Sequence, residues 1–419
     1  MKNFDRREFL QLAGAASLGS AVVGSAPLGY PSSRAGWATP VGVTTDEAAA
    51  DPWLEIDLKN MAWNLAQIRR RTDNRPVMAV IKANAYGHGL VAIGRFLEKH
   101  KIDFLAVGKF HEALQLRESG VKMPILNLGP FSQHEAADIV RQNISQSVYT
   151  DDFMLLAEAV RKLKRRAKVH LKIDTGLGRV GVPHGRALAF VEKVAANSEI
   201  QIEGIFTPFT EDDEFDRIQL ERFLEVCVAA KQRGIAVGLR HAASSAGILS
   251  FPQSHLDMVR PGIAIYGQYP SVREYQARQI DLRPVMSLKA RVMYVKTLQP
   301  GESVSYHRAF VAQQETQVAT LPLGYSDGYP SQAAGKAEIL VQGRRWPTIA
   351  LVTSNHATIN VTGAERIKIG DEAVIFGKQD ENEINAEELA AWAGVSVYKI
   401  LIGMNPLLPR VYREGEEIR

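Results

Sequence analysis

The sequence predicts an α/β barrel (TIM-like, eight βα repeats) followed by a separate β-rich C-terminal domain. Short β-branched apolar runs alternate with amphipathic helical stretches between residues 76 and 283. From residue 284 onward, strand-like runs follow one another with turns between them. A length of 419 residues accommodates both parts. We place the barrel at residues 51–283 and the β-rich domain at 284–419, and we expect the strand at 51–60 to pack with the β-rich domain.

Eight apolar runs supply the expected barrel strands: Val77–Lys82, Phe104–Val107, Ile125–Leu128, Ser145–Tyr149, Val169–Asp174, Ile202–Thr207, Val237–Ala242 and Met258–Ile263. Between them lie segments with apolar residues at helical spacing: Val91–His100, His111–Ser119, Gln133–Gln142 and Asp152–Arg166. Parallel barrel strands are continuously apolar and need crossover helices, which matches this pattern. A doubly wound open sheet alternates in the same way and remains the alternative.

The β-rich domain is expected from six runs: Met286–Thr297, Gln317–Leu323, Glu338–Val341, Thr348–Val352, Ala357–Thr362 and Glu372–Gly377. Turns such as Asp327-Gly328 separate them, and the one helical stretch is Ala386–Ala393. Strands without alternating helices indicate a domain separate from the barrel.

The N-terminal residues predict an export signal. Arg6-Arg7 and Phe9-Leu10 precede an apolar stretch from Leu12 to Val23, and small residues follow at Ser25-Ala26. The paired arginines resemble a twin-arginine signal, so we assign residues 1–26 to a signal peptide and 27–50 to a flexible tether. This predicts an exported, periplasmic protein, with an ordinary amphipathic first helix as the alternative. No segment has the apolar length of a stable membrane span.

Composition excludes several classes of function. A formal net charge of +4 over 419 residues is small, so no nucleic-acid partner is expected. Cys227 is the single cysteine, which excludes an intramolecular disulfide and a cysteine-based zinc site. We expect no metal, and Cys227 is most simply a core residue.

A lysine at the end of the first barrel strand is the strongest sign of chemistry. It lies in Val80–Gly89, which reads Val-Ile-Lys-Ala-Asn-Ala-Tyr-Gly-His-Gly. Lys82 is thereby placed at the carboxyl-terminal face of the barrel, where the active sites of such barrels lie. A desolvated amine has a lowered pKa and suits Schiff-base formation with an aldehyde cofactor. From position alone, a lysine that extends to solvent at the barrel mouth remains the alternative.

This run closely resembles the attachment motif for pyridoxal 5'-phosphate (PLP) of the alanine racemase family, and the resemblance extends from Trp53 to Tyr412. The resemblance implies that Lys82 binds PLP covalently and then acts as one catalytic base. It also implies that Tyr86 contacts the cofactor phosphate. The expected activity is interconversion of L- and D-alanine, with room for other amino acids as substrates.

The block His170–Gly181 contributes an arginine and a second lysine. Arg179 follows a strand and a Gly-rich turn, and its guanidinium can bind a carboxylate through two parallel hydrogen bonds. By resemblance, Arg179 belongs to substrate binding. Lys172 matches a lysine that many family members carbamylate, which turns a cation into an anion beside this arginine. A plain surface ion pair is the alternative for Lys172.

Two blocks near the end of the barrel suit a phosphate. One runs from His241 to Gly247 and opens a short helix, and the other is Met258–Ile263. Loops after the last two strands of such barrels commonly bind phosphate through backbone N–H groups and helix N-termini. By resemblance, the cofactor-binding residues of these blocks are His241, Ser245, Arg260, Gly262 and Ile263.

Arg260 indicates which reaction the cofactor supports. By resemblance it faces the pyridine nitrogen of PLP, with His241 behind it. A cation there opposes protonation of the nitrogen, so PLP withdraws electrons less strongly than a pyridinium would. A short-lived carbanion that is reprotonated at Cα favours racemisation over transamination.

Racemisation needs a base on each face of Cα, and Tyr306 is the second candidate. A free tyrosine has a pKa near ~10, so cationic neighbours must activate it. In the family this tyrosine comes from the other subunit of a homodimer, so each active site spans two chains. Tyr325 matches a tyrosine at the family's entrance. Without the resemblance, both would be aromatic residues on strand faces.

Four departures from the family pattern bear on the substrate. Thr207-Pro208-Phe209 lacks a histidine that usually lies near the catalytic tyrosine, and the common Asn-Ser phosphate pair is Ser244-Ser245. The substrate-binding Met-Asp pair aligns with Ser354-Asn355, and a late phosphate-binding tyrosine aligns with Pro406. The small or polar replacements for Met and Tyr should widen the entrance and change its hydrogen bonding, so substrates other than alanine are expected. The alternatives are another PLP barrel enzyme, such as a D-amino-acid aldolase or lyase, and a non-catalytic PLP- or amino-acid-binding protein.

Overall fold

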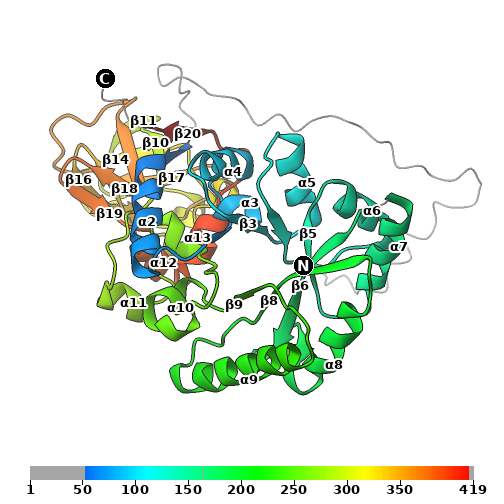
Figure 1. Ribbon diagram of the computed structural model, residues 1–419. Helices are drawn as coiled ribbons and strands as arrows, with labels where there is room; N and C mark the ends of the chain where they lie inside the picture. Colours follow the sequence, from blue (N-terminus) through cyan, green and yellow to red (C-terminus); the bar gives the residue numbers. More distant parts are fainter. Residues whose placement is uncertain (1–51, 164, 415–419) are drawn as a thin grey trace, which may run out of the picture. The chain divides into compact units, whose positions relative to one another are not determined.

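The computed structural model describes residues 52–163 and 165–414 of the chain. The signal peptide and tether predicted for residues 1–50 lie outside these ranges. In the described part, no helix combines the length and the apolar character needed to cross a membrane. Two large sheets organise these residues, a parallel one in the first half and a mainly antiparallel one chiefly in the second half (Figure 1).

The parallel sheet has its strands in sequence order, β2-β3-β4-β5-β6-β8-β9. They are β2 (Met78–Val80), β3 (Phe104–Val107), β4 (Ile125–Asn127), β5 (Ser145–Val148), β6 (Ala167–Asp174), β8 (Ile200–Phe206) and β9 (Leu239–His241). The short strand β7 (Val182–Pro183) pairs with the end of β6. Strands β2, β3 and β4 are buried along their whole length, because helices cover one face and side chains fill the other.

The predicted eighth strand, Met258–Ile263, is not a regular strand, although it closes the ring. Val259 forms a parallel bridge with Val77, and the N–H of Val80 donates to the carbonyl of Pro261 over 2.9 Å. Pro261 has no N–H to continue a ladder, which is why the pairing here is irregular. The barrel prediction is confirmed, with this position as its exception.

Helices α5 to α9 lie around the barrel strands in Figure 1. The helices of this region are α2 (Leu58–Arg71), α3 (Lys82–Tyr86), α4 (Leu90–Lys99), α5 (Phe110–Glu118), α6 (Gln133–Arg141), α7 (Phe153–Leu163), α8 (His184–Ala195), α9 (Asp213–Gln232), α10 (Ser245–Ser250) and α11 (Val272–Ala277). Helices α5 and α6 begin in the same way. A glutamate three residues into each helix, Glu112 or Glu135, accepts the N–H of the N-cap residue.

The antiparallel sheet has the order β11-β14-β17-β16-β15-β18-β10-β1-β20, with β19 on β18. Its strands are β1 (Trp53–Asp57), β10 (Met286–Arg291), β11 (Tyr294–Leu298), β14 (Thr316–Leu321), β15 (Glu338–Val341), β16 (Arg344–Ile349), β17 (Ala357–Asn360), β18 (Glu372–Gln379), β19 (Asn382–Ile384) and β20 (Arg410–Arg413). A separate hairpin joins β12 (Ser303–Val304) to β13 (Phe310–Val311).

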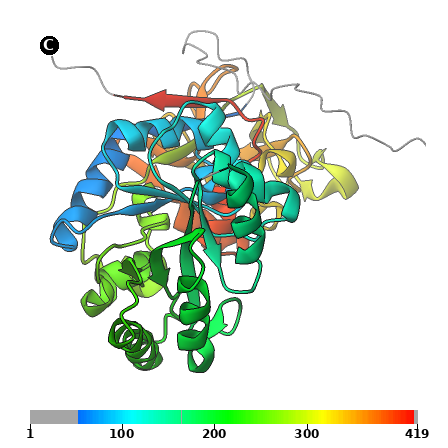
Figure 2. The same cartoon turned by 45° about the vertical axis from the view of Figure 1, so that its right-hand side comes forward.

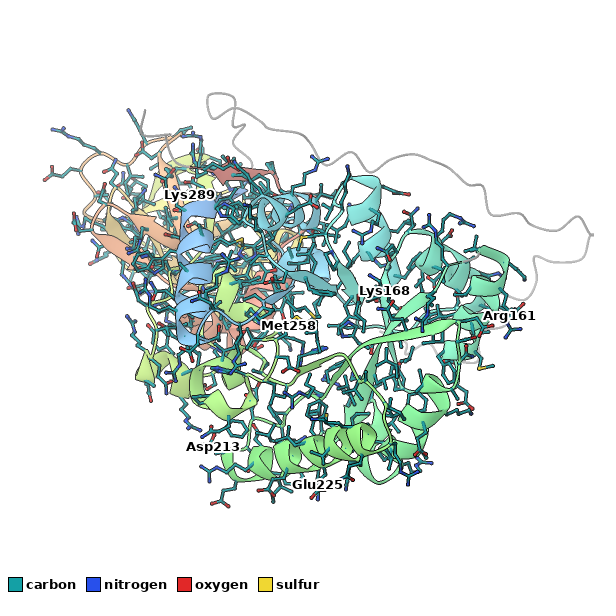
Figure 3. All side chains as sticks on the ribbon, viewed as in Figure 1. Arg161, Lys168, Asp213, Glu225, Met258 and Lys289 are labelled. Carbon is teal, nitrogen blue, oxygen red and sulfur yellow. The ribbon has the colours of Figure 1, made fainter. Side chains whose placement is uncertain are left out.

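Strand β1 joins the two ends of the described chain. It pairs antiparallel with β10 and parallel with β20, the strand at the sheet edge in Figure 2. Lys289, labelled in Figure 3, forms ion pairs with Glu55 at 3.2 Å and Glu372 at 3.4 Å. These pairs tie β1, β10 and β18 together.

Other parts of the chain also differ from the prediction. The run Met286–Thr297 is two strands, β10 and β11, because the chain leaves the ladder between them. The strand expected at 51–60 ends at Asp57, whose carboxylate accepts the N–H of Asn60 at 2.9 Å and caps α2. Besides the predicted helix α12 (Ala386–Ala393), a second helix, α13 (Val397–Gly403), follows it.

Candidate functional site

The lysine of the motif begins a left-handed helical turn rather than ending a strand. The next three residues, Ala83, Asn84 and Ala85, have φ of 55°, 56° and 53°, and Tyr86 has φ of 51°. L-residues enter this conformation at a cost of roughly 1–2 kcal/mol each. Such a run persists only where the surrounding structure fixes it, and strain of this kind gathers at active sites.

Contacts from distant parts of the chain hold this turn. The N–H of Asn84 donates to Oε1 of Glu112 on α5 at 3.2 Å. On the other side, Nε of Arg410 on β20 donates to the carbonyl of Gly87 at 2.8 Å. A barrel helix and the last strand of the antiparallel sheet therefore both fix the segment that carries the lysine.

Lys82 extends into the barrel mouth, where its side chain is exposed. Its stem lies on Gly108, since a Cβ added to Gly108 would be 3.2 Å from that of Lys82. The protein around the amine and the charge of Arg179 lower the pKa of Lys82, and Glu112 opposes this shift. A lowered pKa increases the neutral, nucleophilic fraction of the amine.

The predicted phosphate ligands lie close to one another. Oγ of Ser245, at the start of α10, accepts from the N–H of Gly262 at 3.0 Å and of Ala264 at 3.2 Å. Gly262 also admits Tyr86, because a Cβ at Gly262 would lie 2.7 Å from the Tyr86 hydroxyl. Ile263 follows as the first residue of a 3-10 helix. These two N–H groups fix the Ser245 oxygen, and its hydroxyl hydrogen remains a donor of the kind that binds phosphate.

Tyr86 is buried, and its hydroxyl stays protonated at neutral pH. Burial raises the pKa of Tyr86 to about 12. Its ring stacks on Tyr266, with 4.9 Å between the centroids, and the Tyr266 hydroxyl donates to the carbonyl of Val80 at 3.1 Å. Tyr266 thus supports both the end of β2 and the predicted phosphate ligand.

Arg260 is buried and fixed by backbone carbonyls. Its guanidinium donates to the carbonyls of His241 at 2.6 Å, Ala242 at 3.0 Å and Thr207 at 3.1 Å. Nη1 of Arg260 also lies 3.1 Å from Nδ1 of His241. Burial lowers the pKa of Arg260 to about 9, so it is still a cation at neutral pH.

A line of buried side chains continues from Arg260 to Glu203. Nε2 of His241 lies 2.8 Å from Nδ1 of His170, and Nε2 of His170 lies 3.3 Å from Glu203. Arg260 can only donate, so Nδ1 of His241 accepts and each histidine carries its hydrogen on Nε2. Burial lowers the pKa of both histidines and keeps them neutral. Lys168, labelled in Figure 3, pairs with Glu203 at 3.2 Å.

Cations gather at the barrel mouth. Burial, together with the charges of Arg179, Arg260 and Lys82, lowers the pKa of Lys172 to about 8. Arg179 itself is exposed. An excess of positive charge in one region favours a ligand that carries phosphate and carboxylate groups.

Tyr306 and Tyr325 belong to 3-10 turns of the β-rich region, not to strand faces. Their side chains are 71% and 58% exposed. Positive φ values surround Tyr306, with 73° at Ser305, 57° at His307 and 52° at Arg308. This second strained turn presents a tyrosine to solvent.

Several departures from the family pattern meet beside Tyr325, at Ser326. The hydroxyl of Ser326 donates to the carbonyl of Ser354 at 2.6 Å and accepts from the Asn355 amide at 2.9 Å. The amide of Asn405, next to Pro406, donates to the Ser326 carbonyl at 2.9 Å. Pro208 lies elsewhere, and its carbonyl accepts from Gln219 at 3.3 Å.

Sequence reasoning missed three polar residues of this region: Glu112, His170 and Glu203. Glu112 looks like an ordinary helix-capping residue in the sequence, and His170 begins the block His170–Gly181, in which only Arg179 and Lys172 show a sign of function. Glu203 occurs in the predicted strand Ile202–Thr207, where a carboxylate gives no signal of a buried partner.

Comparison with known families agrees with this arrangement. Residues 56–270 match the model of the alanine racemase N-terminal domain, and residues 285–412 match that of the alanine racemase C-terminal domain. The alanine racemase of Desulforamulus reducens is 39% identical over 367 residues, which cover 86% of this chain and 98% of that protein. Alanine racemase 1 of Clostridium acetobutylicum is 36% identical over 372 residues, which cover 87% and 96%.

Solved structures give the same result. The alanine racemase of Clostridium difficile 630 superposes with a TM-score of 0.83 at 31% identity and covers 88% of this chain and 97% of its own. The alanine racemase from D-cycloserine-producing Streptomyces lavendulae superposes with a TM-score of 0.83 at 32% identity and covers 88% and 99%. From the matched domains and these relatives, the chain belongs to the alanine racemase family.

Proposed function

We propose that this chain is an isomerase, a PLP-dependent racemase that interconverts L- and D-alanine. The observation that carries the proposal is the left-handed turn that begins at Lys82 and brings Tyr86 against Gly262. Relatives at 36–39% identity over nearly their whole length are alanine racemases, which supports the same activity.

The residues of the barrel mouth fit PLP. Gly262 lets the Tyr86 hydroxyl approach where a Cβ would clash at 2.7 Å, and its N–H donates to the Ser245 hydroxyl at 3.0 Å. Ser245, Gly262, Ile263 and Tyr86 would hold the phosphate, and Lys82 would hold the aldehyde carbon. Arg260 would face the ring nitrogen as a cation, because its pKa of about 9 keeps it protonated at neutral pH.

Each protein group then has a separate task. When bound, PLP withdraws electrons from Cα of the amino acid and makes its proton removable. Nζ of Lys82, with its lowered pKa, removes or returns that proton on one face. Arg179 binds the substrate carboxylate. The positive charge of Arg260 would lie at the ring nitrogen and limit electron withdrawal, which would favour prompt return of the proton to Cα.

The second base is Tyr306 of another copy of the chain, in a homodimer whose active sites are shared. Its 71% exposure and strained turn support a role outside its own domain. The exposed apolar side chains of the β-rich region include Tyr325, Leu351 and Leu407, which a second copy of the chain would cover. Tyr325 would line the entrance to the site.

A substrate range wider than alanine is part of the proposal. Ser354, Asn355 and Asn405-Pro406 meet at Ser326, beside the entrance tyrosine. Where the family pattern has Met and Tyr, the smaller Ser354 and Pro406 leave more room for a side chain. Substrate binding by Ser354 belongs to this same proposal.

We further propose export by the twin-arginine route to the periplasm. Arg6-Arg7 and the apolar stretch after them support it. A route that carries folded proteins suits an enzyme that acquires PLP in the cytosol. Replacing both arginines by lysine should keep active enzyme inside the cell, and undiminished periplasmic activity would argue for another route.

The decisive experiment supplies PLP and L-alanine to the purified chain. D-Alanine should form and be detected with a D-amino-acid oxidase, and optical rotation should decay to zero. A panel of larger L-amino acids measures the substrate range in the same assay. Cleavage products in place of the enantiomer would favour a lyase, and PLP binding without turnover would favour a non-catalytic protein.

A further inference from the structure

Glu112 is a buried carboxylate that accepts hydrogen bonds from two separate backbone segments. Its side chain is 6% exposed. Oε1 accepts the N–H of Asn84 at 3.2 Å, and Oε2 accepts the N–H of Gly108 at 2.9 Å and of Lys109 at 3.2 Å. One carboxylate thus joins the turn after β2 to the turn after β3.

Both segments border Lys82. Asn84 lies two residues after it, inside the left-handed turn. Gly108 lies beneath its stem, where a Cβ would be 3.2 Å from Cβ and 3.8 Å from Cδ of Lys82. Glu112 therefore fixes the start of the lysine side chain from two sides.

We propose that Glu112 is a positioning residue that holds the Lys82 amine in its reactive place, a role that rests on the proposed racemase function for its kinetic consequence. The strained turn needs an external acceptor for the N–H of Asn84, and Glu112 supplies it. The carboxylate also opposes the lowering of the Lys82 pKa, so it acts on both the position and the charge of the amine.

Helix capping is the rival explanation, and the chain offers a matched control for it. Glu135 occupies the same position in α6 and accepts the N–H of its N-cap residue, Ser132, at 2.7 Å. Its other contact is the Ser132 hydroxyl at 2.9 Å, on the same exposed cap. Glu135 thus reproduces the cap of Glu112 without a link to the lysine.

The test compares Glu112→Gln, Glu112→Asp and Glu135→Gln in the full-length protein with PLP. Glutamine has one acceptor oxygen and cannot serve both segments, while aspartate keeps the charge but is one methylene shorter. Both Glu112 variants should lower kcat roughly tenfold to a hundredfold with a smaller change in KM, since a small displacement of a catalytic group has that effect. Glu135→Gln should keep the kcat of the unmodified enzyme.

A second measurement does not need turnover. An amine-reactive reagent is applied to PLP-free protein over a range of pH, and modification of Lys82 is followed by peptide mass spectrometry. Glu112→Gln should move the midpoint of Lys82 modification to lower pH, because it removes the charge that raises this pKa. Glu112→Asp and Glu135→Gln should leave the midpoint close to that of the unmodified protein.

Two results would overturn the positioning role. One is a Glu112→Gln protein whose kcat and Lys82 midpoint both match those of Glu135→Gln. The other is a loss of kcat in Glu135→Gln as large as in Glu112→Gln, which would assign the effect to capping. If Glu112→Gln does not fold, Glu112→Asp against Glu135→Asp gives the same kinetic comparison. An unmodified protein without racemase activity would instead contradict the proposed function itself.

Discussion

The turn at Lys82 and the turn at Tyr306 are both strained, but they are held in different ways. Residues 83–86 and residues 305, 307 and 308 all have positive φ. The Lys82 turn donates a hydrogen bond to Glu112 on α5 and accepts one from Arg410 on β20, so elements outside the turn hold it. The Tyr306 turn is held within its own hairpin, where Arg308 donates to the carbonyl of Gly301 at 2.6 Å.

This contrast divides the proposed site into a barrel part, whose residues are held by other elements, and an exposed part around Tyr306. In the barrel, the proposed cofactor-binding residues Tyr86, Ser245 and Arg260 are buried, and Ser245 accepts a backbone hydrogen bond from Gly262. Tyr306 presents 71% of its side chain to solvent. A side chain on a strained, exposed turn can act once another surface meets it. We therefore propose that Tyr306 acts in the active site of a second copy of the chain.

The largest expected effect comes from a substitution in the barrel part of the site. Lys82→Ala removes the amine that we propose binds the cofactor and moves the proton, so activity should fall by ~10³-fold or more, and covalent PLP should disappear. Activity and the absorbance of bound PLP measure this directly. Lys109→Ala, an exposed lysine after the next barrel strand, is the control and should stay active. Covalent PLP on another lysine would contradict the assignment.

At the Tyr306 turn, we expect a large effect on catalysis without an effect on PLP binding. Tyr306→Phe removes the proposed second general base and should reduce racemisation by ~10²–10⁴-fold while PLP binding is unchanged. Exchange of the Cα hydrogen with solvent should slow far more from the L enantiomer than from the D enantiomer. Tyr294→Phe, another exposed tyrosine of the β-rich region, should behave like the unmodified enzyme. Equal slowing from both enantiomers would count against two bases.

Combining the two variants in one dimer tests whether Lys82 and Tyr306 of one active site come from different chains. A dimer of one Lys82→Ala chain and one Tyr306→Phe chain contains one intact site if the tyrosine crosses the interface, and it should recover about half of the normal activity. Purified heterodimers carrying two different tags allow this measurement. No recovery in such heterodimers would mean that both residues act within one chain.

The same contrast explains which parts of the structure could be predicted from the sequence. Alternating apolar runs predicted β3 and the other buried strands, because burial on both faces leaves a clear pattern. The left-handed turn could not be read from Ala83, Asn84 and Ala85, whose intrinsic preference is for other conformations. The turn is stable because Glu112 accepts a hydrogen bond from Asn84 and Arg410 donates one to the carbonyl of Gly87. Tertiary contacts of this kind leave no pattern in the local sequence.

The eighth barrel position teaches a similar lesson. Met258–Ile263 has the apolar character of a strand, but Pro261 interrupts its ladder. Motifs located Lys82, Ser245 and Arg260 because several chemical groups recur together in them. They did not locate Glu203, whose partner His170 is 33 residues away and is recognised only in the folded barrel.

The smallest expected effect concerns the cluster of positive charges around Lys172 in the barrel part of the site. We predict that Lys172 takes up CO2 and becomes an anion beside Arg179. With a pKa of about 8, its amine is mostly protonated at pH 7 and mostly neutral at pH 9, so uptake of CO2 should rise with pH across that range.

Carbamate formed from ¹³C-bicarbonate would be seen by NMR. The signal should vanish in Lys172→Ala but persist in Lys168→Ala, which removes a lysine that pairs with Glu203 instead. Activity should fall about tenfold in Lys172→Ala, because a hydrogen bond to a charged group contributes roughly 1.5 kcal/mol. A carbamate signal that survives in Lys172→Ala, or activity indifferent to that substitution, would leave Arg179 to bind the substrate carboxylate without an anionic neighbour.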